Sequence, residues 1–140
     1  MQSDYLYYGT ITPDIKEFIP KKRHVPGMRG SNEPAAVHAG DDPAFAAAHA
    51  FPWSFDEGIN VVYDRDKVVL EMPRALLGRL AEKIYIYKLP KEKFELLRGI
   101  EPRGRNYVCY ERVQPVGVDA FKSVSDALRY YGAELKVIPW

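Results

Sequence analysis

Residues 5–10, which read YLYYGT, are the first in the chain whose types could do chemistry. Aromatic and aliphatic residues alternate up to Tyr8, as in a strand, and the run then breaks at a Gly-Thr pair. Because glycine has no Cβ, Gly9 would let a ligand approach the backbone, and the Thr10 hydroxyl could hydrogen-bond to it. An edge strand followed by an ordinary turn would give the same pattern. The stretch therefore predicts either a binding site at a strand end or a simple turn.

A second candidate is the basic loop at residues 20–32. It combines two prolines and two glycines with four basic residues, among them Arg23. The prolines and glycines exclude a regular element here. Several Lys and Arg side chains so close together could bind phosphate groups, although a solvated loop without a ligand would look the same. Arg23 is thus a candidate for contact with phosphate groups.

Composition narrows the classes of protein that need to be considered. The chain has 140 residues, of which 46% are hydrophobic and 28% charged, so we expect one soluble domain with a real core. A net charge of +1 gives no general attraction to nucleic acid or membrane. The single cysteine excludes an intramolecular disulfide and a four-cysteine zinc site, and no metal-ligand spacing links the three histidines. We therefore expect a cytoplasmic protein without a metal site or a membrane span.

Short strands and helices alternate irregularly along the chain. Hydrophobic periodicity predicts about seven strands, clearest at 84–88, with a hairpin turn at 64–66. Asp42 should cap an alanine-rich helix over 43–50, and Ser123 should cap a helix that ends near Gly132. We also expect a helical turn at 14–18, a helix at 74–82, and a turn or short helix at 91–97. The absence of strictly alternating βαβ units favours an α+β fold over a doubly wound sheet.

Three of these pieces, in this order, resemble the ADP-ribosyltransferase fold family, which includes poly-ADP-ribose polymerases and RNA 2′-phosphotransferases. The pieces are the strand end Tyr8-Gly9-Thr10, the strand and alanine-bearing helix of residues 34–48, and the late strand NYVCY at 106–110. The resemblance implies a single domain over residues 1–140, with a split β-sheet, short flanking helices and NAD as the cofactor.

The family's three chemical side chains are replaced here. The position of its NAD-gripping histidine is occupied by Tyr8, while Gly9 and Thr10 match the motif. The stacking tyrosine corresponds to Val37, and the catalytic glutamate corresponds to Asn106, although the following Tyr107 matches. The resemblance thus preserves the framework around a degenerate His-Tyr-Glu triad.

The side chains that stand at the three replaced positions determine which interactions with NAD the site could still make. Asn106 can hydrogen-bond to a ribose hydroxyl, but it brings no negative charge to the cation that forms as nicotinamide leaves. Tyr8 can hydrogen-bond to a hydroxyl, and Val37 offers apolar contact without stacking. Glu111, five residues after Asn106, is a carboxylate that could substitute. Asn106 and Glu111 are thus the candidate catalytic residues, and Tyr8, Gly9, Thr10, Arg23, Val37 and Tyr107 are the candidate cofactor-binding residues.

The sequence leaves three functions open. The first is a divergent ADP-ribosyltransferase-like protein that binds NAD or a related nucleotide, with weak, unusual or lost transferase activity. The second is a protein-interaction module on the same fold, as in toxin-antitoxin or phage-encoded small proteins, with another protein as its partner. The third is an RNA-directed protein similar to the RNA 2′-phosphotransferases, in which Arg23, Arg103 and Arg105 would contact phosphates.

Overall fold

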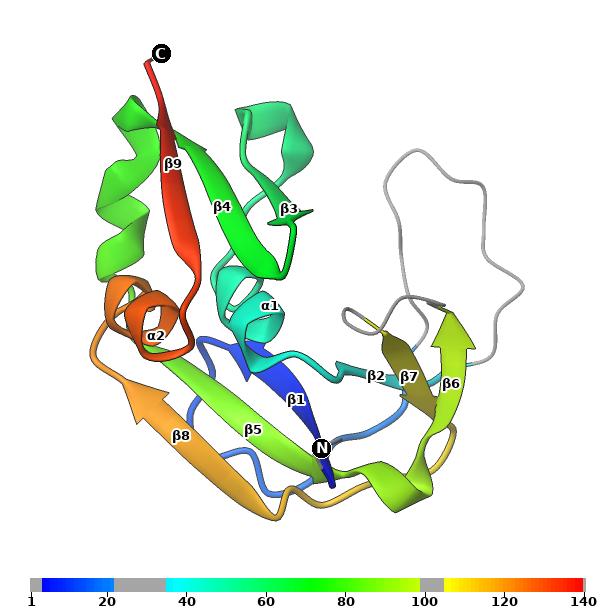
Figure 1. Cartoon of the computed structure of the whole chain (residues 1–140). Helices are drawn as coiled ribbons and strands as arrows, with labels where there is room; N and C mark the ends of the chain where they lie inside the picture. Colours follow the sequence, from blue (N-terminus) through cyan, green and yellow to red (C-terminus); the bar gives the residue numbers. More distant parts are fainter. Residues whose placement is uncertain (1–3, 22–34, 99–104, 140) are drawn as a thin grey trace.

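Two β-sheets and two short α-helices form the described part of the chain, residues 4–21, 35–98 and 105–139 of a computed structural model (Figure 1). The larger sheet has six strands in the order β6-β7-β2-β1-β5-β8, and all its neighbouring strands are antiparallel. The smaller sheet has the order β3-β4-β9, with β9 parallel to β4. The chain is thus an α+β protein built mainly of strands.

The elements have the following bounds. The strands of the larger sheet are β1 (Tyr5–Thr10), β2 (Val37–Gly40), β5 (Ile84–Pro90), β6 (Glu95–Arg98), β7 (Asn106–Cys109) and β8 (Gly117–Phe121). Those of the smaller sheet are β3 (Asn60–Asp64), β4 (Lys67–Pro73) and β9 (Glu134–Ile138). The α-helices are α1 (Pro43–Ala48) and α2 (Val124–Tyr130), and the 3-10 helices are η1 (Phe55–Glu57), η2 (Arg74–Ala81) and η3 (Lys91–Lys93).

Successive side chains of β5 point to opposite faces of the larger sheet and belong to two separate hydrophobic clusters, one on each face. Ile84 and Ile86 face α1, α2 and the smaller sheet, where they join the first cluster. Tyr87 and Leu89 point the other way and join the second. Because successive residues of a strand point to opposite faces, both clusters require unbroken alternation. The strand predicted at 84–88 is confirmed, and it extends to Pro90.

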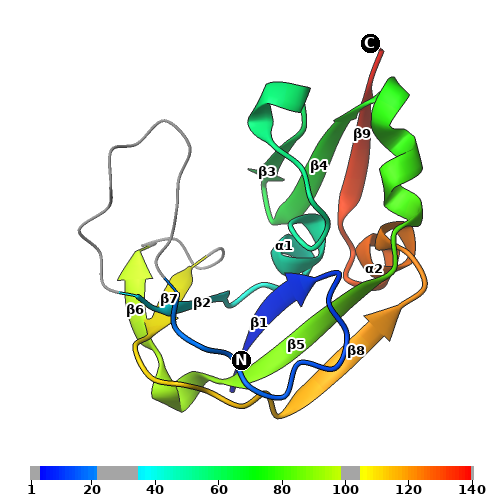
Figure 2. The ribbon, with the colours of Figure 1, turned by 180° about the vertical axis from the view of Figure 1, so that it is seen from behind.

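The second cluster is covered by the segment of residues 11–21, which follows β1 and crosses the back of the larger sheet (Figure 2). The Tyr87 hydroxyl accepts a hydrogen bond from the Ile15 N–H at 3.1 Å and donates one to the Thr12 carbonyl at 2.8 Å. Further along, the Phe18 N–H donates to the Val113 carbonyl at 2.7 Å. These hydrogen bonds hold residues 11–21 against the sheet, so the segment is an integral part of the fold.

The predicted caps and the hairpin are confirmed. The Asp42 carboxylate accepts a hydrogen bond from the Ala44 N–H at 2.9 Å at the start of α1. The Ser123 hydroxyl accepts one from the Asp126 N–H at 3.1 Å at the start of α2. The turn between β3 and β4 places Arg65 in a left-handed conformation with φ 58°. Local side-chain chemistry was sufficient to predict these features.

Three predicted elements differ from the structure. Residues 14–18 form no helical turn, because Phe18 pairs with Val113, which is remote in sequence. The helix expected at 74–82 is the 3-10 helix η2, and residues 91–97 divide into η3 and the start of β6. Long-range pairing and packing decide these conformations, and periodicity does not contain that information. None of the described helices combines the length and apolarity that a membrane crossing requires.

Candidate functional site

The end of β1 is held by direct contact with α1. A Cβ atom on Gly9 would lie 2.2 Å from the Ala46 carbonyl oxygen and 2.9 Å from the Ala50 Cβ. Glycine at this position and alanine on the helix therefore allow the helix and strand backbones to touch. On the side where a Gly9 side chain would point, the close approach that the sequence suggested for a ligand is made by α1.

A fork between β1 and β2 lies beside this contact. The two strands share one register pair, Tyr7 with Gly40, and beyond it β1 continues to Thr10 while β2 leads back to Val37. A cleft of about 540 Å³ opens at this fork, which we call the Tyr8 cleft. It is lined by residues of β1, of segment 11–21, of β2 and of β7: Tyr8, Thr10, Thr12, Ile15, Glu17, Phe18, Ile19, Lys21, Ala36, Val37, His38 and Asn106.

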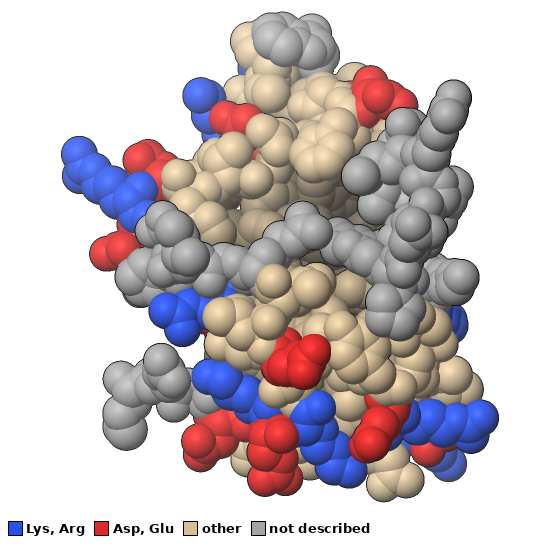
Figure 3. All heavy atoms as spheres, turned by 90° about the vertical axis from the view of Figure 1, so that its right-hand side faces the viewer, with Lys and Arg blue, Asp and Glu red and all other residues tan. Residues whose placement is uncertain are grey.

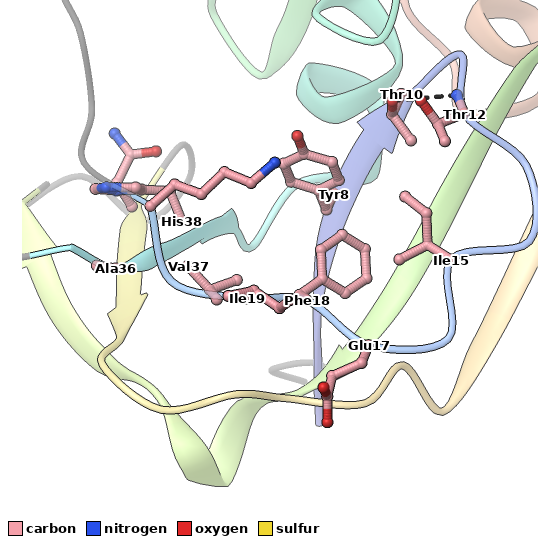
Figure 4. A pocket seen from close by; sticks show the side chains of 12 residues that line it. Tyr8, Thr10, Thr12, Ile15, Glu17, Phe18, Ile19, Ala36, Val37 and His38 are labelled. Carbon is pink, nitrogen blue, oxygen red and sulfur yellow. Dashed lines mark hydrogen bonds between the residues drawn. The ribbon is translucent and has the colours of Figure 1, made fainter.

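Aromatic rings form one wall of the Tyr8 cleft (Figure 4). The Tyr8 ring meets the Phe18 ring edge-on with centroids 5.1 Å apart, and Phe18 in turn meets Tyr87 at 5.4 Å. Phe18 and Tyr87 are buried, whereas Tyr8 is 37% exposed. A ligand in the cleft would therefore meet a supported aromatic surface with an accessible hydroxyl at its edge.

Asn106 reaches the cleft because the start of β7 is anchored to the end of β2. Asn106 pairs with Gly40, which itself pairs with Tyr7, so the three strands are in register at this level. Just before it, the Arg105 N–H donates to the Asp41 carboxylate at 3.0 Å, and the Asp41 N–H donates to the Arg105 carbonyl at 3.3 Å. Burial raises the pKa of Asp41, and the hydrogen bond from Arg105 opposes that rise.

Lys21 supplies a positive charge at the cleft. Its backbone forms two hydrogen bonds, of 3.2 and 3.0 Å, with Ala36, the residue that precedes β2. Glu17, the single carboxylate among the described lining residues, forms an ion pair with Arg112 at 3.5 Å. Lys21 therefore lacks a compensating carboxylate within the cleft lining, which favours an anionic ligand.

Hydroxyl groups stand at the upper end of the cleft. The Thr10 hydroxyl oxygen accepts a hydrogen bond from the Thr12 N–H at 3.2 Å (Figure 4). Its own proton is then available to donate to a ligand. His38 lines the cleft from β2, on the side away from Thr10 (Figure 4).

The predicted site residues divide between the cleft and other places. Tyr8, Thr10, Val37 and Asn106 all line the cleft, although Val37 is itself 5% exposed. Tyr107 is buried in the second cluster, with the Lys91 ammonium 5.3 Å from its ring centroid.

Two further predictions concern charged residues. Glu111 is exposed and follows the end of β7 opposite to Asn106, so it does not line the cleft. Arg23 and Arg103 lie outside the described residues. Lys21, one of the four basic residues of the loop predicted at 20–32, lines the cleft. Sequence reasoning missed Phe18 and His38 as site residues, because only the non-local pairings of segment 11–21 and β2 bring them to the fork.

Comparisons of the chain with protein-family models, with curated proteins and with solved structures found no match. The part of the chain that the structure describes contains no group of three or more His, Cys, Asp and Glu side chains arranged to hold a metal ion.

Proposed function

We propose that the chain binds NAD or a related nucleotide in the Tyr8 cleft, as a divergent protein of ADP-ribosyltransferase type. One observation carries the proposal. The three positions that the resemblance assigns to chemistry, Tyr8, Val37 and Asn106, lie on the adjacent strands β1, β2 and β7 and line one cleft. This shared lining supports the proposal.

The lining groups suit the parts of a nucleotide. A planar ring would pack against the Tyr8 and Phe18 rings. The Thr10 hydroxyl and the Asn106 amide would hydrogen-bond to ribose hydroxyls or to an amide, and Lys21 would pair with a phosphate. The volume of about 540 Å³ lies within the range of small-molecule sites.

The same lining predicts slow or absent group transfer. Glycosidic cleavage of NAD builds positive charge on the ribose, and a nearby carboxylate stabilises that charge. Asn106 is neutral, and the Glu17 charge is already paired with Arg112. We therefore propose a site that binds its nucleotide and has lost most of the family's transferase activity.

Calorimetric titration with NAD tests the binding. We expect saturable binding that weakens up to about fivefold in Lys21→Gln, the range for one exposed charge pair. Lys16→Gln is the matched control, because Lys16 is also exposed and lies on the same segment but does not line the cleft. Absence of binding at millimolar NAD, or equal weakening by both variants, would contradict the proposal.

A further inference from the structure

A second hollow, which shares no lining residue with the Tyr8 cleft, surrounds Trp53. It has a volume of about 400 Å³ and is lined by Phe51, Pro52, Trp53, Glu57, Arg79 and Glu82. Trp53 is held in place, because its indole N–H donates to the Ala48 carbonyl at 2.9 Å. The hollow thus combines a fixed indole ring with two carboxylates and one guanidinium.

An aromatic strip continues from this hollow across α1 to β3. The His49 ring lies 5.2 Å from Trp53 and 4.3 Å from Phe45, and Phe45 stacks on Tyr63 with centroids 5.7 Å apart. On the other side, Phe55 meets Trp53 edge-on at 5.4 Å and is 71% exposed. In Figure 3, uncharged side chains cover much of the upper half of the face that includes β3.

The charges that line the hollow favour a cation. They are the two carboxylates of Glu57 and Glu82 and the single guanidinium of Arg79. Arg79 already donates from both terminal nitrogens to the two Glu57 carboxylate oxygens, one bond being 2.8 Å, and this pairing lowers the pKa of Glu57. Among the described residues, no Lys or Arg forms an ion pair with the exposed Glu82.

The pairing of Arg79 with Glu57 indicates which kind of cation fits the hollow. A guanidinium is planar, pairs with carboxylates through two parallel hydrogen bonds and packs on aromatic faces, whereas an ammonium is a compact, strongly hydrated charge. The hollow offers Glu82 as a carboxylate and Trp53 as an aromatic face. A second guanidinium could therefore repeat beside Glu82 the pairing that Arg79 makes with Glu57. A phosphate or nucleic-acid strand would instead meet a net negative charge.

We infer that the Trp53 hollow binds an arginine side chain from a basic segment of a partner protein. The inference does not depend on nucleotide binding, because the lining residues of the two sites do not overlap. The arginine would pack on the Trp53 ring and pair with Glu82, and the exposed Phe55 would provide apolar contact for the neighbouring residues of that segment.

Titration of isotope-labelled protein with a blocked tri-arginine peptide tests the inference. We expect the Trp53 indole N–H signal to shift saturably, with tri-lysine binding more weakly and tri-glutamate not at all. Glu82→Gln should weaken tri-arginine about two- to fivefold, as for one exposed charge pair. Glu92→Gln changes the net charge equally at an exposed position outside the hollow, so its affinity should equal that of the wild type.

A second variant tests the aromatic contact. Trp53→Leu should weaken tri-arginine about two- to fivefold through loss of the cation–π contact, while the melting temperature reports whether the variant still folds. If Trp53→Leu does not fold, the comparison of Glu82→Gln with Glu92→Gln decides. An unmoved Trp53 signal, equal weakening by both glutamate variants, or tighter binding of an oligonucleotide at Trp53 would overturn the inference.

Discussion

A Cβ atom on Gly9 would lie 2.2 Å from the carbonyl oxygen of Ala46, so β1 and α1 touch backbone to backbone. This contact fixes the end of β1 at the point where β2 diverges and the Tyr8 cleft opens. Gly9 thus influences the shape of the cleft by allowing α1 to pack directly on β1. Any role for Gly9 in holding a ligand would use its backbone groups.

Gly9→Ala should destabilise the protein by about 1–3 kcal/mol or more, because the added methyl group meets a backbone oxygen that cannot rotate away. Gly78→Ala is the matched control, since nothing lies within 4 Å of its Cβ position, and we expect that variant to be neutral or slightly more stable. Urea unfolding of both variants measures the difference. Equal stability of the two would show that α1 does not pack on β1 as described.

Tyr87→Phe should loosen the wall of the cleft. The substitution leaves the Ile15 N–H and the Thr12 carbonyl without their hydroxyl partner, at a cost of about 1–3 kcal/mol. Faster amide hydrogen exchange at Ile15 than in the wild type would report the loss. Tyr110→Phe, at a position 47% exposed, should leave that exchange rate unchanged. Unaltered exchange in Tyr87→Phe would contradict the role given to this hydroxyl.

His49 should make stability depend on pH. Its ring lies between Phe45 and Trp53 although part of the residue is exposed, and burial lowers its pKa below the ordinary value of 6.5. The unfolded chain then takes up the proton first, so this contribution is present above pH 6.5 and is lost as the pH falls through the folded-state pKa. We expect the loss in melting temperature between about pH 7.5 and about pH 5.5 to be smaller in His49→Gln than in the wild type.

Asn106→Glu should restore part of the lost chemistry. With NAD bound, a carboxylate at this position would face the developing ribosyl cation, and we expect nicotinamide release to rise on the order of tenfold or more. Asn106→Gln is the control, because it has the same length without the charge. If both variants bind NAD and release nicotinamide equally slowly, the ligand does not place its ribose beside Asn106.

Local chemistry predicted much of the fold. The alternating residues at 84–88 are those whose side chains enter the two hydrophobic clusters. The Asp42 and Ser123 caps depend on hydrogen bonds to residues no more than three positions away. The pairing of Phe18 with Val113 could not be predicted in this way, because the two residues are 95 positions apart and neither lies in an alternating run.

In the candidate site, too, some residues could be predicted from the local sequence and others depend on long-range pairing. The motifs indicated Tyr8, Val37 and Asn106 because each stands in a recognisable run of residues, and all three line the cleft. Lys21 comes from a segment without periodicity, and its position depends on the bridge to Ala36. Glu111 is close to Asn106 in sequence, but Asn106 is the first residue of the four-residue strand β7 and Glu111 lies past the other end of that strand, outside the cleft lining.

Nucleotide binding in the Tyr8 cleft is what we propose for this protein. The most direct test is a titration of isotope-labelled protein with NAD, following every assigned backbone amide. We predict saturable shifts that cluster at residues 8–12, at Val37 and His38, and at Asn106, with a Tyr8→Ala variant losing them. Shifts that cluster elsewhere, or no shifts at millimolar NAD with ADP-ribose also silent, would contradict the account.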